Sequence, residues 1–384
     1  MAIRCTRCLY DDTVPRIHFD DAGICNYCHM HDQLNQEYPT GEEGQKRLNA
    51  IADQIRKDGH GKQYDLIVGV SGGCDSSYLL YMAVQMGLRP LAVHFDNTWN
   101  STVAVENIQT VLEALDVDLY TYVVDNKEYD DIYRAFLKAG VPDVEAPTDI
   151  GLAVTLNMAA EKYGVQYIFE GHSFRTEGVA PLGWIYMDGK YIESVHKQYG
   201  TLPMKTYPNL WLKDFLRVTT LRGLKKIRPL YYMDYVKQDA MALLTSKLGW
   251  EWYGGHHLEN RFTAFWHTYF MPTRYDIDTR LLGYAALVRS GQLTREKGLE
   301  LIAQPQSYDP ELLEMVKKRL GYSDEEFEQI MNLPRKTYRD FKTYKKTFER
   351  LRPFFWALYK LNRVPKSFYI KFTAPDPLPS QVSK

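Results

Sequence analysis

Apolar residues recur along the chain at two spacings, and their alternation predicts an α/β protein. Four short runs are apolar and rich in β-branched or aromatic residues, as buried parallel strands are. These runs cover residues 64–70, 90–96, 118–124 and 167–173. Helical spacing predicts helices at residues 42–57, 78–83, 103–115 and 151–163. Strands that alternate with helices in this way predict a doubly wound parallel sheet.

The pattern becomes helical in the second half of the chain. Between residues 174 and 232 the periodicity fades, which favours an insertion that lines a substrate cleft. Further helices are predicted at residues 236–248, 278–290, 294–302, 310–320 and 323–331. We therefore expect four parts: an N-terminal module (1–40), a linker helix (41–60), the sheet domain (61–234) and a helical region (235–384).

The composition narrows the class of protein. Of the 384 residues, 45% are hydrophobic and 25% are charged, so the chain is long enough for two or three domains with a full core. The formal net charge of −1 argues against a dedicated nucleic-acid-binding protein, because such domains carry a basic excess. The sequence shows no signal peptide and no apolar run of bilayer length. We therefore expect a cytoplasmic protein without a transmembrane segment.

Four of the five cysteines predict a metal centre in the N-terminal module. Cys5 and Cys8 form one Cys-x-x-Cys pair, and Cys25 and Cys28 form a second pair after residues 9–24. This is the spacing of a zinc ribbon, in which two knuckles present four thiolates tetrahedrally to Zn²⁺. A redox or iron–sulfur site is the alternative. A module this small needs its metal in order to fold.

The first predicted strand runs directly into a loop with the sequence Ser-Gly-Gly-Cys-Asp-Ser-Ser, and a helix follows. The two glycines permit a tight turn and a close approach of a ligand, and the serines can cap the helix. Unpaired N–H groups and the helix dipole then favour phosphate, while Asp75 is suited to a Mg²⁺ ion that bridges phosphate oxygens. No Gly-Lys-Ser/Thr follows, so this is not a Walker A loop. The residues predicted to bind the phosphates are Ser71, Gly72, Gly73, Asp75, Ser76 and Ser77.

Polar residues also follow two other predicted strands. Asp96 ends the second strand, and Gly171 and His172 end the last one. Ligands of open parallel sheets lie beyond the carboxyl ends of the strands, so all three are candidates for contacting a nucleotide. The alternatives are a turn-initiating role for Asp96 and a capping or packing role for His172. Arg228 could steady a phosphate or an adenylate, or form a surface salt bridge.

Residues 253–263 are dense in groups that donate, accept or pair charge, and these groups are costly to bury without a ligand. We expect this stretch to form the sugar- or acid-binding wall of the cleft. A second zinc site, with a histidine of the stretch and Glu259 as ligands, is the alternative. The candidate substrate residues are His256, His257, Glu259 and Arg261.

Residues 335–371 carry twelve Lys or Arg against Asp340 and Glu349, interleaved with aromatic residues. Such a segment is either the solvated basic face of a packed C-terminal helix or a contact to a nucleotide sugar, a nucleic acid or a membrane surface. The sequence leaves these alternatives open.

The loop with its preceding strand resembles the pyrophosphate loop of the PP-loop ATP pyrophosphatases, which have the adenine nucleotide alpha hydrolase-like fold. This superfamily includes asparagine, GMP and NAD synthetases and tRNA-thiolating enzymes. Its members adenylate a carbonyl-type oxygen, release pyrophosphate and let a nitrogen or sulfur nucleophile displace AMP. The resemblance implies ATP and Mg²⁺ as cofactors and extends to the Gly-His and Arg-Pro-Leu segments. It therefore implies that Asp75, His172 and Arg228 lie at the reacting centre.

Several motifs together resemble those of the N-acetyl sugar amidotransferases of bacterial surface-polysaccharide synthesis, such as that of lipopolysaccharide O-antigen. The motifs are the four-Cys ribbon, Gly-Val-Ser-Gly-Gly-Cys-Asp-Ser-Ser, Phe-Glu-Gly-His-Ser, Gly-Gly-His-His-x-Glu and the late Pro-Lys-Ser-Phe-Tyr. The resemblance implies that ammonia replaces the ATP-activated acetamido oxygen of a nucleotide-linked N-acetyl sugar, giving an acetamidino group. It also implies separate glutaminase and cyclase-like subunits that supply ammonia, because the chain shows no glutaminase constellation of its own.

Two alternative functions follow from the same motifs. A tRNA-modifying, thiolating enzyme of the superfamily would also join a zinc ribbon to a pyrophosphate loop. The net charge and the lack of spare cysteines beyond the ribbon and Cys74 argue against it, so we expect no nucleic-acid partner. A non-enzymatic binding protein with a degenerate nucleotide fold is the other alternative, and the intact Asp75-Ser76 argues against that.

Overall fold

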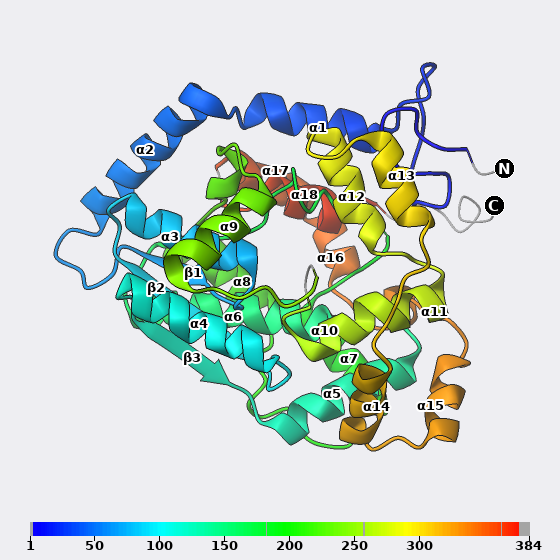
Figure 1. Cartoon of the computed structure of the whole chain (residues 1–384). Coiled ribbons are helices and arrows are strands. Elements are labelled where there is room, and N and C mark those ends of the chain that lie inside the picture. The colour runs from blue at the N-terminus through cyan, green and yellow to red at the C-terminus, as the bar shows by residue number, and fades with distance from the viewer. Residues whose placement is uncertain (1–2, 182, 256–257, 362, 376–384) are drawn as a thin grey trace.

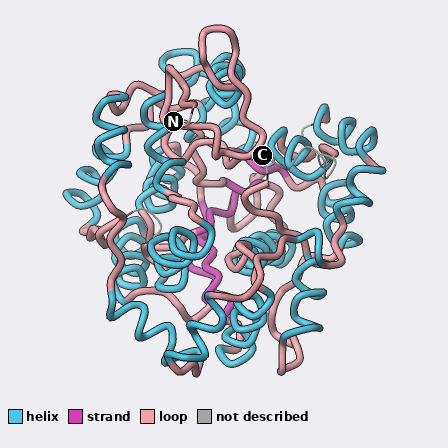
Figure 2. The backbone as a smooth tube through the Cα atoms, turned by 90° about the vertical axis from the view of Figure 1, so that its right-hand side faces the viewer, coloured by secondary structure: helices cyan, strands magenta, loops and turns pink. Residues whose placement is uncertain are grey.

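A five-stranded parallel β-sheet lies inside a shell of helices (Figures 1 and 2). The structure is a computed structural model, and it describes residues 3–181, 183–255, 258–361 and 363–375. The strands are β1 (Leu66–Gly69), β2 (Pro90–Asp96), β3 (Leu119–Val123), β4 (Tyr167–Phe169) and β5 (Lys225–Ile227). Neighbouring strands all pair in parallel, in the order β3-β2-β1-β4-β5. This confirms the predicted doubly wound α/β fold.

Helices cover both faces of the sheet, because successive side chains of a strand point to opposite sides. On one face, Leu66 and Val68 of β1 share an apolar cluster with four helices. These are α2 (Gly41–Asp58), α3 (Cys74–Gln85), α4 (Thr102–Leu115) and α9 (Lys237–Leu248). On the other face, Ile67 packs with α6 (Ala146–Lys162). The loop between β1 and α3 thus lies at the carboxyl edge of a sheet that is covered on both sides.

Two elements of the sheet domain were not predicted. The first is helix α5 (Asn126–Ala139), which begins directly after the third strand. Its N-cap is Asp125, whose side chain accepts a hydrogen bond from Glu128 N. Strand β5 escaped prediction because it is a short edge strand whose two lysines are exposed, so it shows no apolar alternation. Before and after β5 along the chain, the remaining elements are α7 (Gly189–Tyr199), α8 (Leu212–Leu216), the π-helix η1 (Arg217–Arg222) and the 3-10 helix η2 (Pro229–Tyr231).

The N-terminal cysteine module lies against the C-terminal helices. Its last knuckle leads into α1 (Asn26–Glu37), and its four cysteines share an apolar cluster with Ala285 of α12 (Arg280–Arg289). In Figure 1 the blue N-terminal segment lies beside the yellow helices α12 and α13 (Arg295–Ala303). The predicted order of cysteine module, sheet domain and helical region is therefore present.

The described part of the C-terminal region contains no strand. Its other elements are α10 (Arg261–Phe265), η3 (Trp266–Phe270), α11 (Met271–Tyr275), α14 (Pro310–Leu320), α15 (Asp324–Met331), η4 (Tyr338–Asp340), α16 (Lys345–Arg350), α17 (Arg352–Lys360) and α18 (Lys366–Thr373). The five helices predicted between residues 236 and 331 are present as α9, α12, α13, α14 and α15. Phe348, Phe355 and Leu358 are buried together, so the basic segment 335–371 includes packed helices.

The domain boundaries expected at residues 40, 60 and 234 stay a prediction. One apolar cluster extends from Phe95 of β2 to Tyr338 in the helical region, so the sheet domain and the helical region share a core. Within the described residues, no helix combines the length and the apolar character that a membrane crossing requires.

Candidate nucleotide site and metal centre

Gly72 determines the shape of the loop after β1. Its φ of +78° is left-handed, and a Cβ at this position would overlap the carbonyl oxygen of Ala104. Both constraints require glycine. The Gly72 carbonyl accepts hydrogen bonds from Trp250 Nε1 at 2.9 Å and from Asn107 Nδ2 at 3.3 Å. Side chains from two regions of the chain thereby hold the turn in place.

The predicted serines complete the loop. Ser76 Oγ donates to the Gly73 carbonyl at 3.1 Å and accepts from Ser71 N at 3.3 Å, and Ser77 is buried in the first turn of α3. Gly73 is the N-cap residue of α3, a helix of 12 residues. The amides of the loop and the positive end of the helix dipole therefore favour an anion such as phosphate.

Asp75 contacts two residues that the sequence pattern did not indicate. Lys237 Nζ lies 3.0 Å from Asp75 Oδ2, and the Tyr235 hydroxyl donates to Asp75 Oδ1. Burial disfavours the charged form of Lys237, but the carboxylates of Asp75 and Glu177 outweigh burial and raise the Lys237 pKa. A largely buried cation thus stands beside the predicted magnesium ligand.

A sequence signal for Lys237 existed. It is the first residue of α9, where a cation opposes the helix dipole. A lysine at such a position calls for a nearby anion, which here is Asp75, 162 residues away.

Gly171 and His172 follow β4, and their predicted contact with a nucleotide stays a prediction. A Cβ at Gly171 would stand 3.6 Å from Ser76 N, so this glycine faces the start of α3. His172 Nδ1 lies 2.9 Å from the Tyr231 hydroxyl, and its Nε2 lies 3.9 Å from Glu177 Oε2. Glu177 also acts on Lys237, so this carboxylate is a neighbour of both His172 and the partner of Asp75.

Arg228 forms a salt bridge. Its Nε lies 3.0 Å from Glu170 Oε2, while Lys226 Nζ lies 3.1 Å from Glu170 Oε1. Burial disfavours the charged carboxylate, but the two cations outweigh it and lower the Glu170 pKa to about 2. Arg228 Nη1 also donates to the Tyr231 hydroxyl at 3.1 Å. The salt-bridge alternative is thus present in the structure, and Tyr231 links Arg228 to His172.

Asp96 initiates a turn at the end of β2. Its Oδ1 accepts a hydrogen bond from Thr98 N at 2.7 Å, which is the alternative considered for this residue. The next residue, Asn97, accepts from Asn260 Nδ2 at 2.9 Å. The edge of the sheet therefore contacts the start of the helical region.

Glu259 connects the polar stretch 253–263 to the loop. Ser71 Oγ donates to Glu259 Oε1 at 3.2 Å, and the Glu259 carbonyl accepts from Ser101 N at 2.9 Å. Arg261 differs: its N–H donates to the Trp99 carbonyl at 2.8 Å, whereas its side chain is exposed. The other two predicted substrate residues, His256 and His257, lie outside the described residues.

The four predicted metal ligands meet at one point. Their Sγ atoms all lie within 4.8 Å of one another and are buried. Individual Sγ–Sγ distances are 3.8 Å for Cys5 and Cys28, 3.7 Å for Cys8 and Cys25, and 3.6 Å for Cys25 and Cys28. Tetrahedral zinc with Zn–S bonds of about 2.3 Å requires S–S separations of about 3.8 Å. The cysteines therefore fit a four-thiolate metal site.

Two arginines of the helical region contact these cysteines. Arg289 Nη2 donates to Cys8 Sγ at 3.1 Å, and the Arg289 guanidinium lies 4.2 Å from the ring centroid of Tyr10. Arg295 donates to the carbonyls of Cys5 at 2.9 Å and Cys8 at 3.2 Å. The buried Arg289 offsets negative charge on the thiolates, as outer-shell partners of metal sites do.

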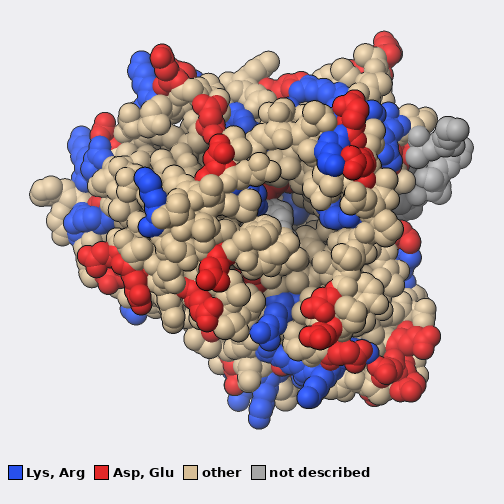
Figure 3. Space-filling model, viewed as in Figure 1, with Lys and Arg blue, Asp and Glu red and all other residues tan. Residues whose placement is uncertain are grey.

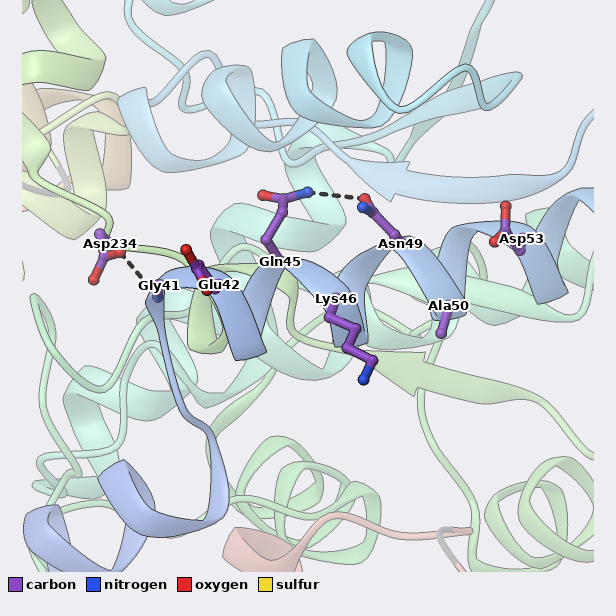
Figure 4. A pocket seen from close by; sticks show the side chains of 8 residues that line it. All are labelled: Gly41, Glu42, Gln45, Lys46, Asn49, Ala50, Asp53 and Asp234. Carbon is purple, nitrogen blue, oxygen red and sulfur yellow. Dashed lines mark hydrogen bonds between the residues drawn. The ribbon is translucent and has the colours of Figure 1, made fainter.

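A shallow surface hollow of about 750 Å³ lies along α2 (Figure 4), and neither the loop residues nor the four clustered cysteines line it. Gln45 Nε2 donates to Asn49 Oδ1 at 2.8 Å there, and Gly41 N donates to Asp234 Oδ2 at 3.0 Å.

Part of the helical region is similar to a known protein family. Residues 259–352 match the family model for the C-terminal domain of WbpG-like LPS biosynthesis proteins. The match covers less than half of the chain. This match confirms the predicted resemblance to proteins of surface-polysaccharide synthesis. The WbpG-like domain begins at Glu259, the residue that contacts Ser71, and it includes Arg289, the residue that contacts Cys8.

Other relatives are similar over shorter or more divergent stretches. The tRNA-specific 2-thiouridylases MnmA from Klebsiella pneumoniae and Yersinia pestis are 32% and 30% identical over 132 residues, each match covering 30% of this chain. The chain spans 36% and 35% of the length of these two relatives. These matches therefore cover only part of this chain and part of each relative.

Two solved structures align with much of the chain but superpose poorly. NMN synthetase from Francisella tularensis has 16% identity and a TM-score of 0.29, with 59% of this chain and 92% of that chain covered. NH3-dependent NAD synthetase from Campylobacter jejuni has 14% identity and a TM-score of 0.30, with 73% and 94% covered. The parallel strand order β3-β2-β1-β4-β5 and the loop after β1 define the fold of this chain.

Proposed function

We propose that this protein is an ATP-dependent, AMP-forming amidotransferase of lipopolysaccharide O-antigen synthesis that acts on a nucleotide-linked N-acetyl sugar. The observation that carries the proposal is the hydrogen bond between Ser71 and Glu259. It joins a loop suited to phosphate to the first residue of a domain found in LPS biosynthesis proteins.

The proposed reaction converts an acetamido group into an acetamidino group. An amide carbon is a poor electrophile, and its oxygen is a poor leaving group. The amide oxygen therefore attacks the α-phosphorus of ATP, and pyrophosphate departs. Ammonia then adds to the activated carbon, AMP departs with the former amide oxygen, and a proton leaves the new nitrogen. Charge develops mainly on the departing phosphates, where fixed positive groups are most effective.

The residues of the site take roles that follow from their positions. The loop amides and the first turn of α3 bind the pyrophosphate portion of ATP. Asp75 would hold the Mg²⁺ ion, which supplies charge neutralisation when bound. Lys237 places a second positive charge at the same point. We assign His172 and Arg228, which share Tyr231, to the reacting end of the site, and Asp96 to the nucleoside end.

We propose that the four N-terminal cysteines hold one structural zinc ion. The Sγ separations, the burial of all four thiols and the arginine contacts support this role. A complete set of four thiolates leaves no open position for a substrate, which is typical of a structural site.

We propose that ammonia comes from separate glutaminase and cyclase-like subunits. Four of the five cysteines meet in the metal cluster, and the fifth, Cys74, is buried beside Tyr235. Burial, followed by the charge of Asp75, raises the Cys74 pKa to about 11, so it is a thiol at neutral pH. A glutaminase nucleophile requires a thiolate, which this environment disfavours.

Mass spectrometry of the products tests the proposal. The protein is incubated with ATP, Mg²⁺, ammonium and a panel of nucleotide sugars with and without an N-acetyl group. We expect AMP and a sugar product in which NH replaces the acetamido oxygen, and only with N-acetylated substrates. Glutamine should replace ammonium only after a glutaminase partner is added. Formation of ADP and phosphate would contradict the adenylation step.

A tRNA-modifying, thiolating function is the second candidate, because the MnmA relatives share sequence with part of this chain. The surface in Figure 3 does not favour it, since basic and acidic side chains are interspersed over the face shown. A protein that reads RNA neutralises several phosphates, so its affinity falls steeply with salt. We expect no tRNA binding tighter than about 10⁻⁵ M at physiological salt, which is near the non-specific range. Saturable tRNA binding with tRNA-stimulated AMP formation would decide for this alternative.

A further inference from the structure

The carboxylate of Glu259 lies over the part of the loop that is suited to phosphate. Its Oε1 accepts from Ser71 Oγ at 3.2 Å and would lie 3.0 Å from a Cβ added to Gly73. The Tyr253 hydroxyl lies 3.2 Å from the same Cβ position. Burial, and next the charge of Glu259, raise the Tyr253 pKa, so the carboxylate and this hydroxyl are close neighbours. An anion and a hydroxyl therefore cover Gly73.

The same place is where the pyrophosphate of ATP would have to lie. Loop amides and a helix N-terminus attract any anion, including a carboxylate of the protein itself. Two anions at hydrogen-bond distance from the same donors repel each other strongly in a partly buried site. We propose that the Glu259 carboxylate occupies the phosphate position of the nucleotide-free loop and is displaced when ATP binds. This inference rests on the proposed function, because it takes ATP as the ligand of the loop.

Only the side chain of Glu259 needs to move in this exchange. Its carbonyl accepts from Ser101 N at 2.9 Å, which holds the backbone to the start of α4. The next residue, Asn260, caps α10 through its side chain and donates to Asn97 Oδ1. Rotation about the side-chain torsions frees the Ser71 hydroxyl for phosphate while the backbone contacts remain. Glu259 is the first residue of the segment that matches the WbpG-like family model, so occupancy of the loop is linked to the start of that segment.

Binding measurements with E259Q test this exchange without any need for turnover. Glutamine keeps the size of the side chain and an oxygen for the Ser71 hydroxyl, but it removes the charge. Calorimetric titration with inorganic pyrophosphate and with ATP, in the presence of EDTA, should show E259Q binding about tenfold more tightly than the wild-type protein, a change of about 1.4 kcal/mol. With Mg²⁺ present the difference should be smaller, because the metal neutralises part of the ligand charge.

Two further variants separate charge from shape and position. E259D keeps the charge on a shorter side chain, so its affinity for pyrophosphate should fall between those of the wild-type protein and E259Q. E251Q makes the same chemical change at an exposed glutamate of the same segment, and it should bind as the wild-type protein does.

An affinity of E259Q equal to or below that of the wild-type protein, when both bind pyrophosphate, overturns the exchange and leaves the proposed function standing. Weaker binding by E259Q only in Mg²⁺ would instead make Glu259 a metal ligand, which also overturns it. Absence of ATP and pyrophosphate binding in every variant would overturn both the proposed function and this inference.

Discussion

The proposed metal centre and the proposed nucleotide loop are both short motifs, but they differ in where their functional side chains come from. The four cysteines lie within residues 5–28 and meet at the separations of a four-thiolate site. The loop spans only residues 71–77, yet its Asp75 contacts Lys237 and its Ser71 contacts Glu259. The four cysteines are thus supplied by one segment, whereas the charged partners of Asp75 and Ser71 are supplied by the helical region.

The largest expected effect concerns the four cysteines, which all come from one segment of the chain. Cys8→Ser removes one thiolate of four and should abolish stoichiometric zinc and most of the soluble yield, because structural zinc binding contributes about 10–16 kcal/mol in small modules. Elemental analysis and thermal unfolding of the purified protein measure both effects. The matched control is Cys74→Ser, which should retain the metal because Cys74 lies outside the cluster. An iron–sulfur chromophore, or zinc retained in Cys8→Ser, would contradict the assignment.

The next effect tests the dependence of the loop on distant charges. Asp75→Asn should lower the rate of AMP formation by about 10²-fold or more, since it removes charge at the departing pyrophosphate. Lys237 then loses its carboxylate partner in a largely buried place, so the melting temperature should also fall. Asp239→Asn, in the same first turn of α9 as Lys237, is the control and should change neither quantity. Turnover of Asp75→Asn at the wild-type rate would remove Asp75 from the site.

A glycine pair tests whether close packing, and not the turn alone, holds the loop. Gly72 and Gly61 both have a left-handed φ, but a Cβ at Gly72 overlaps Ala104 whereas a Cβ at Gly61 meets nothing within 4 Å. Gly61→Ala should cost about 1–2 kcal/mol of unfolding free energy from backbone strain alone. Gly72→Ala should cost more and should also abolish ATP binding. Equal costs in chemical denaturation would show that α4 does not constrain the loop.

The smallest expected effect is a pH dependence next to the loop. The Glu170 pKa is lowered in the folded protein to about 2, so this carboxylate stabilises the fold above its unfolded pKa of about 4.3, and the contribution is lost as the pH falls toward 2. Between pH 5 and pH 2 the wild-type protein should therefore lose about 1–2 kcal/mol more unfolding free energy than Glu170→Gln, after allowance for the partial exposure of the ion pair. Urea unfolding at a series of pH values measures this. A difference in unfolding free energy that does not change with pH would show that Lys226 and Arg228 do not lower the Glu170 pKa.

Local patterns predicted what is local in the molecule. The spacing of the cysteines predicted that the four thiols lie together, and the apolar runs predicted the parallel sheet with the Ser-Gly-Gly loop at its edge. Strand β5 was not predicted, because an exposed edge strand with two lysines shows no apolar alternation. Capping by Asp125 concealed the start of α5 for a similar reason, since a polar residue after a strand is also typical of a turn.

Long-range charge pairing could not be predicted from patterns. Nothing near Asp75 in the sequence indicates Lys237 or Tyr235, and nothing near Glu170 indicates Arg228. These pairs depend on how α9 and β5 pack against the sheet, which spacing alone does not specify. The contact of Arg289 with Cys8 is of the same kind, because it joins residues 281 positions apart.

The central claim is that the amide oxygen of the sugar becomes bonded to the α-phosphorus of ATP, and one isotope measurement tests it directly. An N-acetylated nucleotide sugar with a heavy-oxygen label in its acetamido group is incubated with the protein, ATP, Mg²⁺ and ammonium, and the nucleotide products are analysed by mass spectrometry. The account predicts that one labelled oxygen appears in AMP and none in pyrophosphate. Label in inorganic phosphate, or AMP without label, would contradict it.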